Sequence, residues 1–164
     1  MTKSSSSPPF LPITPPCRAP PALKQIADYD VEMINTVRNS NLTKLVDLYN
    51  MGRNMNACNK FSESIVHMSC RRAKYDVVEF LLSHGGDASI VDDYGRTPLH
   101  DACWRLEPAF DIVTLILDKN NELLRCSDAR GAIPLRYVPQ AHWAQWCVYL
   151  YHQREKYWPI LPSH

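Results

Sequence analysis

The sequence has 164 residues, of which 45% are hydrophobic and 21% are charged, and its formal net charge is +1. This length and composition fit one ordinary globular domain and exclude a disordered polyelectrolyte. Eighteen basic residues against seventeen acidic ones give no overall basic field. A protein that holds nucleic acid or an anionic membrane by charge alone is therefore not expected.

The first 25 residues form an arm rich in proline and serine. Seven of the thirteen prolines fall before residue 22, and no acidic residue precedes Asp28. Because this segment has no apolar period with which to bury surface, residues 1–25 are predicted to be a disordered, weakly cationic tail. Three other roles stay open for it: a polyproline ligand at its PxxP spacings, a phosphorylation site at Ser7 or Thr14, and an organelle transit peptide.

The rest of the chain gives no indication of export or membrane insertion. No apolar core of seven or more residues follows the basic start, and the longest uncharged stretch, residues 137–153, is too polar to span lipid. The six cysteines stand singly, without a CxxC pair, which is typical of reduced thiols. We therefore expect a cytoplasmic or nuclear protein without a membrane partner.

The middle of the chain repeats with a period of 33 residues. Residues 92–103 align with residues 59–70, and the apolar block at 77–82 recurs at 112–117 with two residues inserted between the blocks of the later copy. A further copy opens at Asp128, and a degenerate first copy is visible over residues 42–52, where Gly52 precedes Gly85 by the same 33 positions. A period of this size indicates a stack of supersecondary units.

Local signals predict what each unit looks like. Gly95 follows two aspartates and a tyrosine, and it is free to adopt the positive φ of a tight turn. Thr97 is placed to cap a short helix that Pro98 starts, and Gly85 is placed to end the longer second helix. Each unit is therefore a short helix, a link, a longer helix and a turn.

The string Thr97-Pro-Leu-His-x-Ala102, together with the 33-residue period and the downstream Val-Val-x-x-x-Leu-Leu pattern, resembles the ankyrin repeat family. The resemblance covers residues 26–157 and implies an all-α solenoid of stacked helix-turn-helix units. The repeats divide at about 26–58, 59–91, 92–127 and 128–157, with the outer two diverged as caps and residues 158–164 left as a tail. In the last repeat, Pro139 is expected to cut the first helix short, while Trp143 and Trp146 help to cover the neighbouring repeat.

The resemblance also implies a function. Proteins of this family usually meet a partner protein on the concave face formed by turn tips and first helices. We expect a non-enzymatic, monomeric module without a cofactor, which binds an acidic or amphipathic partner. Aromatic and arginine residues are enriched at protein interfaces, and the candidate contact residues on this face are Phe61, Arg71, Arg72, Tyr94, Arg96, Trp104, Arg105 and Arg130.

Two other chemistries deserve comparison with this interpretation. His67 with Cys70 and His100 with Cys103 have the i, i+3 spacing of a thiolate-imidazole pair or of half a zinc site. Equivalent positions on packed helices lie about 8–10 Å apart, which is too far for shared ligation, so a structural role for these residues is favoured. Weak nucleic-acid binding through Arg71, Arg72 and Lys74 with the cationic arm is the other alternative; we do not expect it, because the charges of the repeats themselves sum to slightly acidic.

Overall fold

The computed structural model describes residues 12–14 and 19–160. Within these residues the regular structure is helical, and extended pairing is limited to two isolated β-bridges. The α-helices are α1 (Leu23–Ala27), α2 (Val31–Arg38), α3 (Leu42–Asn50), α4 (Ile65–Arg71), α5 (Tyr75–Ser83), α6 (Pro98–Cys103), α7 (Phe110–Lys119) and α8 (Trp143–Tyr157). Three short 3-10 helices lie between α7 and α8, namely η1 (Asn121–Arg125), η2 (Pro134–Tyr137) and η3 (Gln140–His142).

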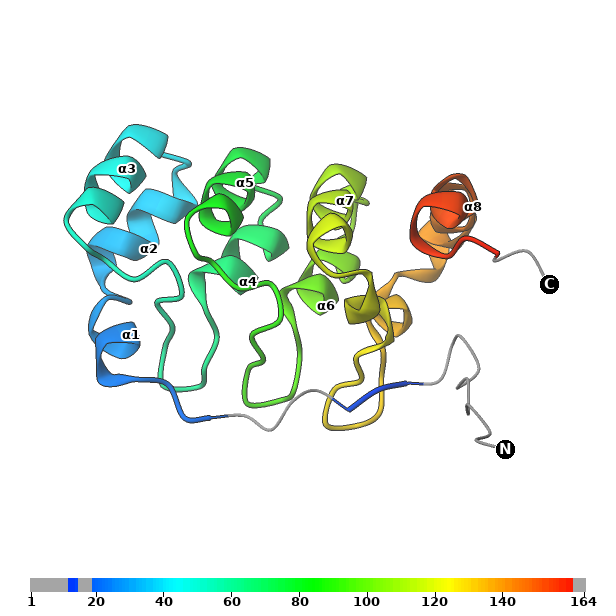
Figure 1. Ribbon diagram of the computed structural model, residues 1–164, viewed down its shortest axis with the longest axis horizontal. Coiled ribbons are helices and arrows are strands. Elements are labelled where there is room, and N and C mark those ends of the chain that lie inside the picture. Colours follow the sequence, from blue (N-terminus) through cyan, green and yellow to red (C-terminus); the bar gives the residue numbers. More distant parts are fainter. Residues whose placement is uncertain (1–11, 15–18, 161–164) are drawn as a thin grey trace, which may run out of the picture.

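The helices stack side by side in two rows, which confirms the predicted all-α solenoid (Figure 1). The inner row consists of α2, α4 and α6, each packed on the next, and η2 closes it. The outer row consists of α3, α5 and α7, and α8 continues it at the C-terminal end. The loops that join each outer helix to the next inner one extend together toward one edge of the molecule, where they form the turn tips (Figure 1).

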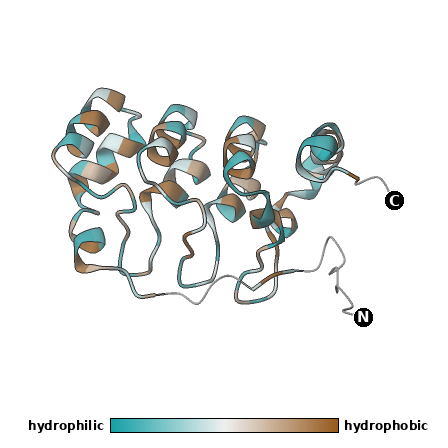
Figure 2. Ribbon diagram, viewed as in Figure 1, coloured by the Kyte–Doolittle hydropathy of each residue, from teal (hydrophilic) through white to brown (hydrophobic). Residues whose placement is uncertain are grey.

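Burial between neighbouring repeats holds the stack together. In α5 the four apolar positions that recur in the sequence, 77, 78, 81 and 82, are all buried. Figure 2 shows hydrophobic and hydrophilic residues mixed along the helices of the stack. Helix α4 is buried over its whole length except for Arg71, because it lies between α2, α5 and α6. No single helix pair has a closed core, so stability depends on contacts between adjacent units.

The turn tips are built on one acidic or amide side chain per repeat. The Asp92 carboxylate accepts hydrogen bonds from the backbone N–H groups of Tyr94 and Arg96, both at 2.9 Å, and Asn59 and Asp128 hold their own tips in the same way. Gly95 adopts φ +74°, as the turn requires. Adjacent tips are also joined through the main chain, since the Tyr94 carbonyl accepts from the N–H of Ala129 at 2.8 Å.

The motif histidines close the short helices and bridge the repeats. In α4 the His67 Nδ1 accepts from the backbone N–H of Ser64 at 3.2 Å, while Nε2 contacts the carbonyl oxygen of Arg96 in the next repeat at 2.8 Å. His100 repeats the arrangement with Thr97 and with the carbonyl of Ala132. Thr97 is the N-cap residue and Pro98 the first residue of α6, as the sequence predicts.

The last repeat departs from the others in the way that Pro139 predicts. Only the 3-10 helix η2 forms before that proline, and α8 then closes the stack. Trp146 is buried against Phe110 of α7, with ring centroids 5.1 Å apart. Trp143 is 55% exposed, so the expectation that it covers the neighbouring repeat is wrong; it instead donates an indole N–H bond to the carbonyl of Val138.

The N-terminal arm is not uniformly disordered. Residues 12–14 and 19–25 are described, Leu23 begins helix α1, and Ile13 pairs with Cys126 in a parallel β-bridge. The prediction of disorder over residues 1–25 is therefore wrong for these segments, because local composition does not show a pairing with a residue far along the chain. Ser7 and most of the PxxP spacings lie outside the described residues.

Candidate partner-binding surface

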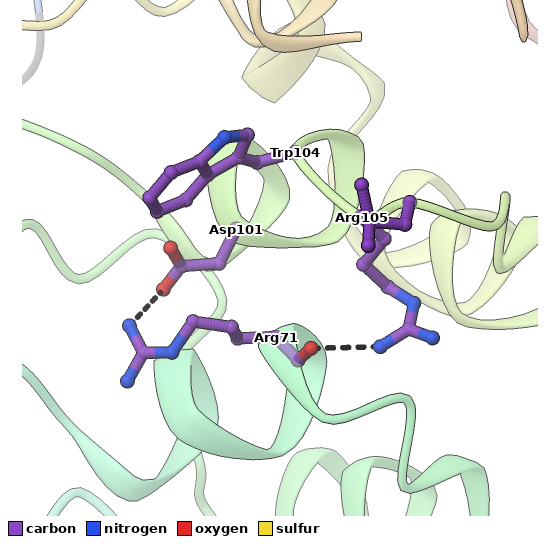
Figure 3. A pocket seen from close by; sticks show the side chains of 5 residues that line it. Arg71, Asp101, Trp104 and Arg105 are labelled. Atoms are coloured by element: carbon purple, nitrogen blue, oxygen red, sulfur yellow. Dashed lines mark hydrogen bonds and ion pairs between the residues drawn. The ribbon is translucent and has the colours of Figure 1, made fainter. Parts of the chain in front are cut away.

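The inner face carries a pocket of about 440 Å³ between the C-terminal ends of α4 and α6 (Figure 3). Its lining residues are Arg71, Asp101, Trp104, Arg105 and Leu106. Three of these were predicted to contact a partner, and the structure does bring them together. Trp104 follows the last residue of α6 and is 54% exposed, while Leu106 in the next loop is 84% exposed. The pocket therefore offers an aromatic and an aliphatic side chain to solvent, next to fixed polar groups.

The two arginines of this pocket are already engaged within the protein. Arg71 forms an ion pair with Glu63 and a longer one with Asp101, 3.5 Å away. Arg105 donates to the carbonyl oxygen of Arg71 at 2.7 Å and to that of Glu107 at 3.2 Å (Figure 3). Both guanidinium groups therefore hold the walls of the pocket, and that of Arg71 is paired with acids of the chain itself.

Asp101 is the residue that the sequence reasoning did not single out. Its side chain is 2% exposed, and its Oδ1 atom is buried without a hydrogen-bond partner. Burial raises the pKa of this carboxyl to about 7, although Arg71 opposes the shift. The signal that could have identified it is an acidic residue directly after the motif histidine, on a helix whose other positions are buried.

A second hollow, of about 370 Å³, lies between the tips of repeats two and three. Phe61 is 53% exposed and Tyr94 66% exposed, and each ring has a cation 5.0 Å from its centroid, Lys60 Nζ and Arg96 Cζ respectively. Arg96 is also held by Asp92 through two contacts of 2.6 and 2.8 Å. Glu63 lines this hollow and forms an ion pair with Arg71, which lines the first hollow, so the walls of the two hollows are linked by this pair.

The remaining predicted contacts do not join this surface in the same way. Arg72 is exposed beyond the end of α4, Arg130 is exposed at the tip of the last repeat, and Lys74 is half-buried at the start of α5. None of the three lines either hollow. Of the basic residues considered for nucleic acid, Arg71 is paired with acids of the chain itself.

The histidine and cysteine pairs of the metal or thiol alternative are structural. Both ring nitrogens of His67 are engaged, and burial lowers the pKa of this imidazole to about 4. Burial also raises the pKa of the Cys70 and Cys103 thiols well above the usual range, which disfavours a thiolate. Over residues 12–14 and 19–160, no cluster of three or more His, Cys, Asp or Glu side chains is placed to hold a metal ion.

No helix in the described part of the chain is long and apolar enough to cross a membrane.

Comparison with known proteins agrees with the geometry. A family model described as ankyrin repeats (three copies) matches residues 33–125, which is more than half of the chain. The chain is 34% identical over 65 residues to an ankyrin repeat-containing protein of Caenorhabditis elegans, covering 40% of this chain and 6% of that protein. It is 31% identical over 115 residues to the tyrosine-protein kinase HTK16 of Hydra vulgaris, covering 70% of this chain and 15% of the kinase.

The neurogenic locus Notch protein of Drosophila melanogaster is 38% identical over 72 residues, which are 43% of this chain and 3% of Notch. The chain thus spans only a small part of the length of each of these relatives, and the likeness is confined to the matched segments.

Proposed function

The chain belongs to the ankyrin repeat family, whose members generally act as protein-protein interaction modules rather than enzymes, and we propose that its partner contacts the joined surface of the two hollows. We call this surface, lined by Phe61, Glu63, Arg71, Asp92, Asp93, Tyr94, Arg96, Asp101, Trp104, Arg105 and Leu106, the inner surface.

The observation that carries the proposal is the exposure of Trp104 and Leu106 in a pocket whose other lining residues, Arg71, Asp101 and Arg105, are polar. A large aromatic ring surrounded by fixed charged groups is the arrangement found at the energetic centre of protein interfaces. Because Arg71 and Arg96 are already paired with acids of the chain, an acidic partner gains little from these two residues. An amphipathic segment that lays apolar side chains on Trp104 and Leu106 fits the surface better.

The test compares capture of partner proteins by three forms of the full chain. Trp104→Ala is expected to lose at least tenfold in affinity for the captured partner, since an aromatic interface residue contributes at least about 1.4 kcal/mol. The matched control is Trp143→Ala, because Trp143 on α8 is exposed to the same extent, 55% against 54%, outside the inner surface. Equal capture by all three forms would refute the assignment of this surface.

We expect the module to act as a monomer in the cytoplasm or nucleus. Light scattering of the purified chain at several concentrations tests the first expectation, and imaging of the tagged chain in cells tests the second. A dimer at micromolar concentration would contradict the monomer prediction.

A further inference from the structure

A mainly apolar groove of about 740 Å³ lies at the C-terminal end of the stack, away from the inner surface. Its floor and walls come from η1, from the segment at η2, from α8 and from the residues that follow α8. The apolar side chains that line it include Leu124, Ile133, Leu135, Leu150, Trp158 and Ile160. Ile160 is 93% exposed, so part of this apolar surface faces solvent. Exposed apolar surface of this kind usually marks a docking site.

The N-terminal arm is fixed at the edge of this groove. The Ile13 backbone N–H donates to the carbonyl oxygen of Arg125 at 2.9 Å, and its own carbonyl accepts from the N–H of Ser127 at 3.0 Å. Arg125 itself lines the groove. Figure 1 shows residues 12–14, in blue, running beside the last loop of the stack. The arm therefore reaches the groove along an interface that is already formed.

The pairing also sets the direction of the chain at Ile13. The bridge between Ile13 and Cys126 is parallel, so Pro12 lies on the side of Arg125, next to Leu124 in the sequence, and Thr14 lies on the side of Ser127. Pro12 and Thr14 are exposed and Ile13 is half-buried against the core, which is the alternation of an extended segment. In an extended segment, side chains two positions apart lie on the same side of the chain.

We propose that the groove is the docking site of the chain's own segment Pro9–Leu11, with the Leu11 side chain seated between η1, η2 and α8. Leu11 lies outside the described residues, and it stands two positions before Ile13. An extended chain covers at most about 7 Å over two residues, which suffices to reach a groove lined by Arg125. The tether keeps the segment at a high effective concentration, which favours it over a separate partner. Pro12 suits the position between the two, because an edge residue there needs no backbone donor.

The experiment uses the full chain with labelled methyl groups and three forms: wild type, Leu11→Ser and the control Leu106→Ser. Leu106 is an exposed leucine in another loop and does not line the groove. In the wild type we expect nuclear Overhauser contacts between the methyls of Leu11 and those of Leu135 or Leu150. Leu11→Ser should shift the groove methyl signals, and Leu106→Ser should not.

A second readout follows the Ser127 amide, whose hydrogen bond to Ile13 the docked segment protects. Its hydrogen exchange is expected to become about tenfold faster in Leu11→Ser, because partial burial of one leucine side chain contributes on that scale. Groove signals that are identical in wild type and Leu11→Ser would overturn the proposal. Groove signals that instead change with protein concentration would assign the groove to a second copy, and this outcome would overturn it as well.

Discussion

Replacing His67 tests whether the bridge between repeats depends on a neutral imidazole. Its Nδ1 accepts from the Ser64 N–H, so Nε2 carries the proton and donates to the Arg96 carbonyl. A second proton would place an N–H against the Ser64 N–H in a buried site. Burial accordingly lowers the pKa of His67 from its ordinary 6.5 to about 4.

The sign of the pH effect follows from this shift. Between pH 6.5 and pH 4 the unfolded chain binds a proton at His67 that the folded chain does not, so the free energy of unfolding falls as the pH falls. A shift of this size corresponds to about 3 kcal/mol between pH 7 and pH 4, at 1.36 kcal/mol per pKa unit. That is a large share of the stability of about 5–15 kcal/mol of an ordinary domain.

The assay is urea unfolding followed by circular dichroism, for wild type and His67→Gln, at several values between pH 7 and pH 4. At pH 7 the wild type should be the more stable of the two, and the difference should shrink by about 3 kcal/mol as the pH reaches 4. The non-titrating variant Leu106→Ser should differ from the wild type by the same amount at every pH. A difference between wild type and His67→Gln that stays constant over this range would refute the reasoning.

Two other substitutions test the tip and the pocket. Gly95→Ala should lower the free energy of unfolding by about 1–3 kcal/mol in urea titrations, because residue 95 has φ +74° and an added Cβ would lie 3.0 Å from the Ala129 backbone nitrogen. The control is Gly131→Ala, where φ is similar but the space around the residue is open, so the loss of unfolding free energy should be smaller. The pKa of the Asp101 carboxyl is about 7 in the folded chain, against 3.8 for an ordinary aspartate. Between pH 4 and pH 7 the folded chain therefore holds a proton that the unfolded chain has lost, so the free energy of unfolding falls as the pH rises. Asp101→Asn should therefore gain stability relative to the wild type over that range, by at most about 4 kcal/mol, and a gain that is flat with pH would contradict the raised pKa.

The sequence predicted which face carries the exposed aromatic residues of the candidate surface, but not how its arginines are paired. Phe61, Tyr94 and Trp104 are exposed on the tips and the inner face, where the repeat pattern places them. The aromatic and arginine residues together were expected to meet an acidic or amphipathic partner, whereas Arg71 and Arg96 pair with Glu63 and Asp92 of the chain itself. Sequence spacing gives the face on which a side chain lies, but it does not show which of several nearby acids a long, flexible guanidinium reaches.

The sequence by itself determined the repeating architecture, because each of its signals is local. Thr97 and Pro98 start a helix, Gly95 allows a turn, and the 33-residue period requires neighbouring copies to cover each other's apolar faces. Only the tertiary structure decided that Asp101 lies buried with a free oxygen atom and that the Ile13 carbonyl accepts a hydrogen bond from Ser127, 114 positions away. Both features depend on which parts of the chain the stack brings into contact. A pattern among neighbouring residues does not show contacts between residues that are far apart in the sequence.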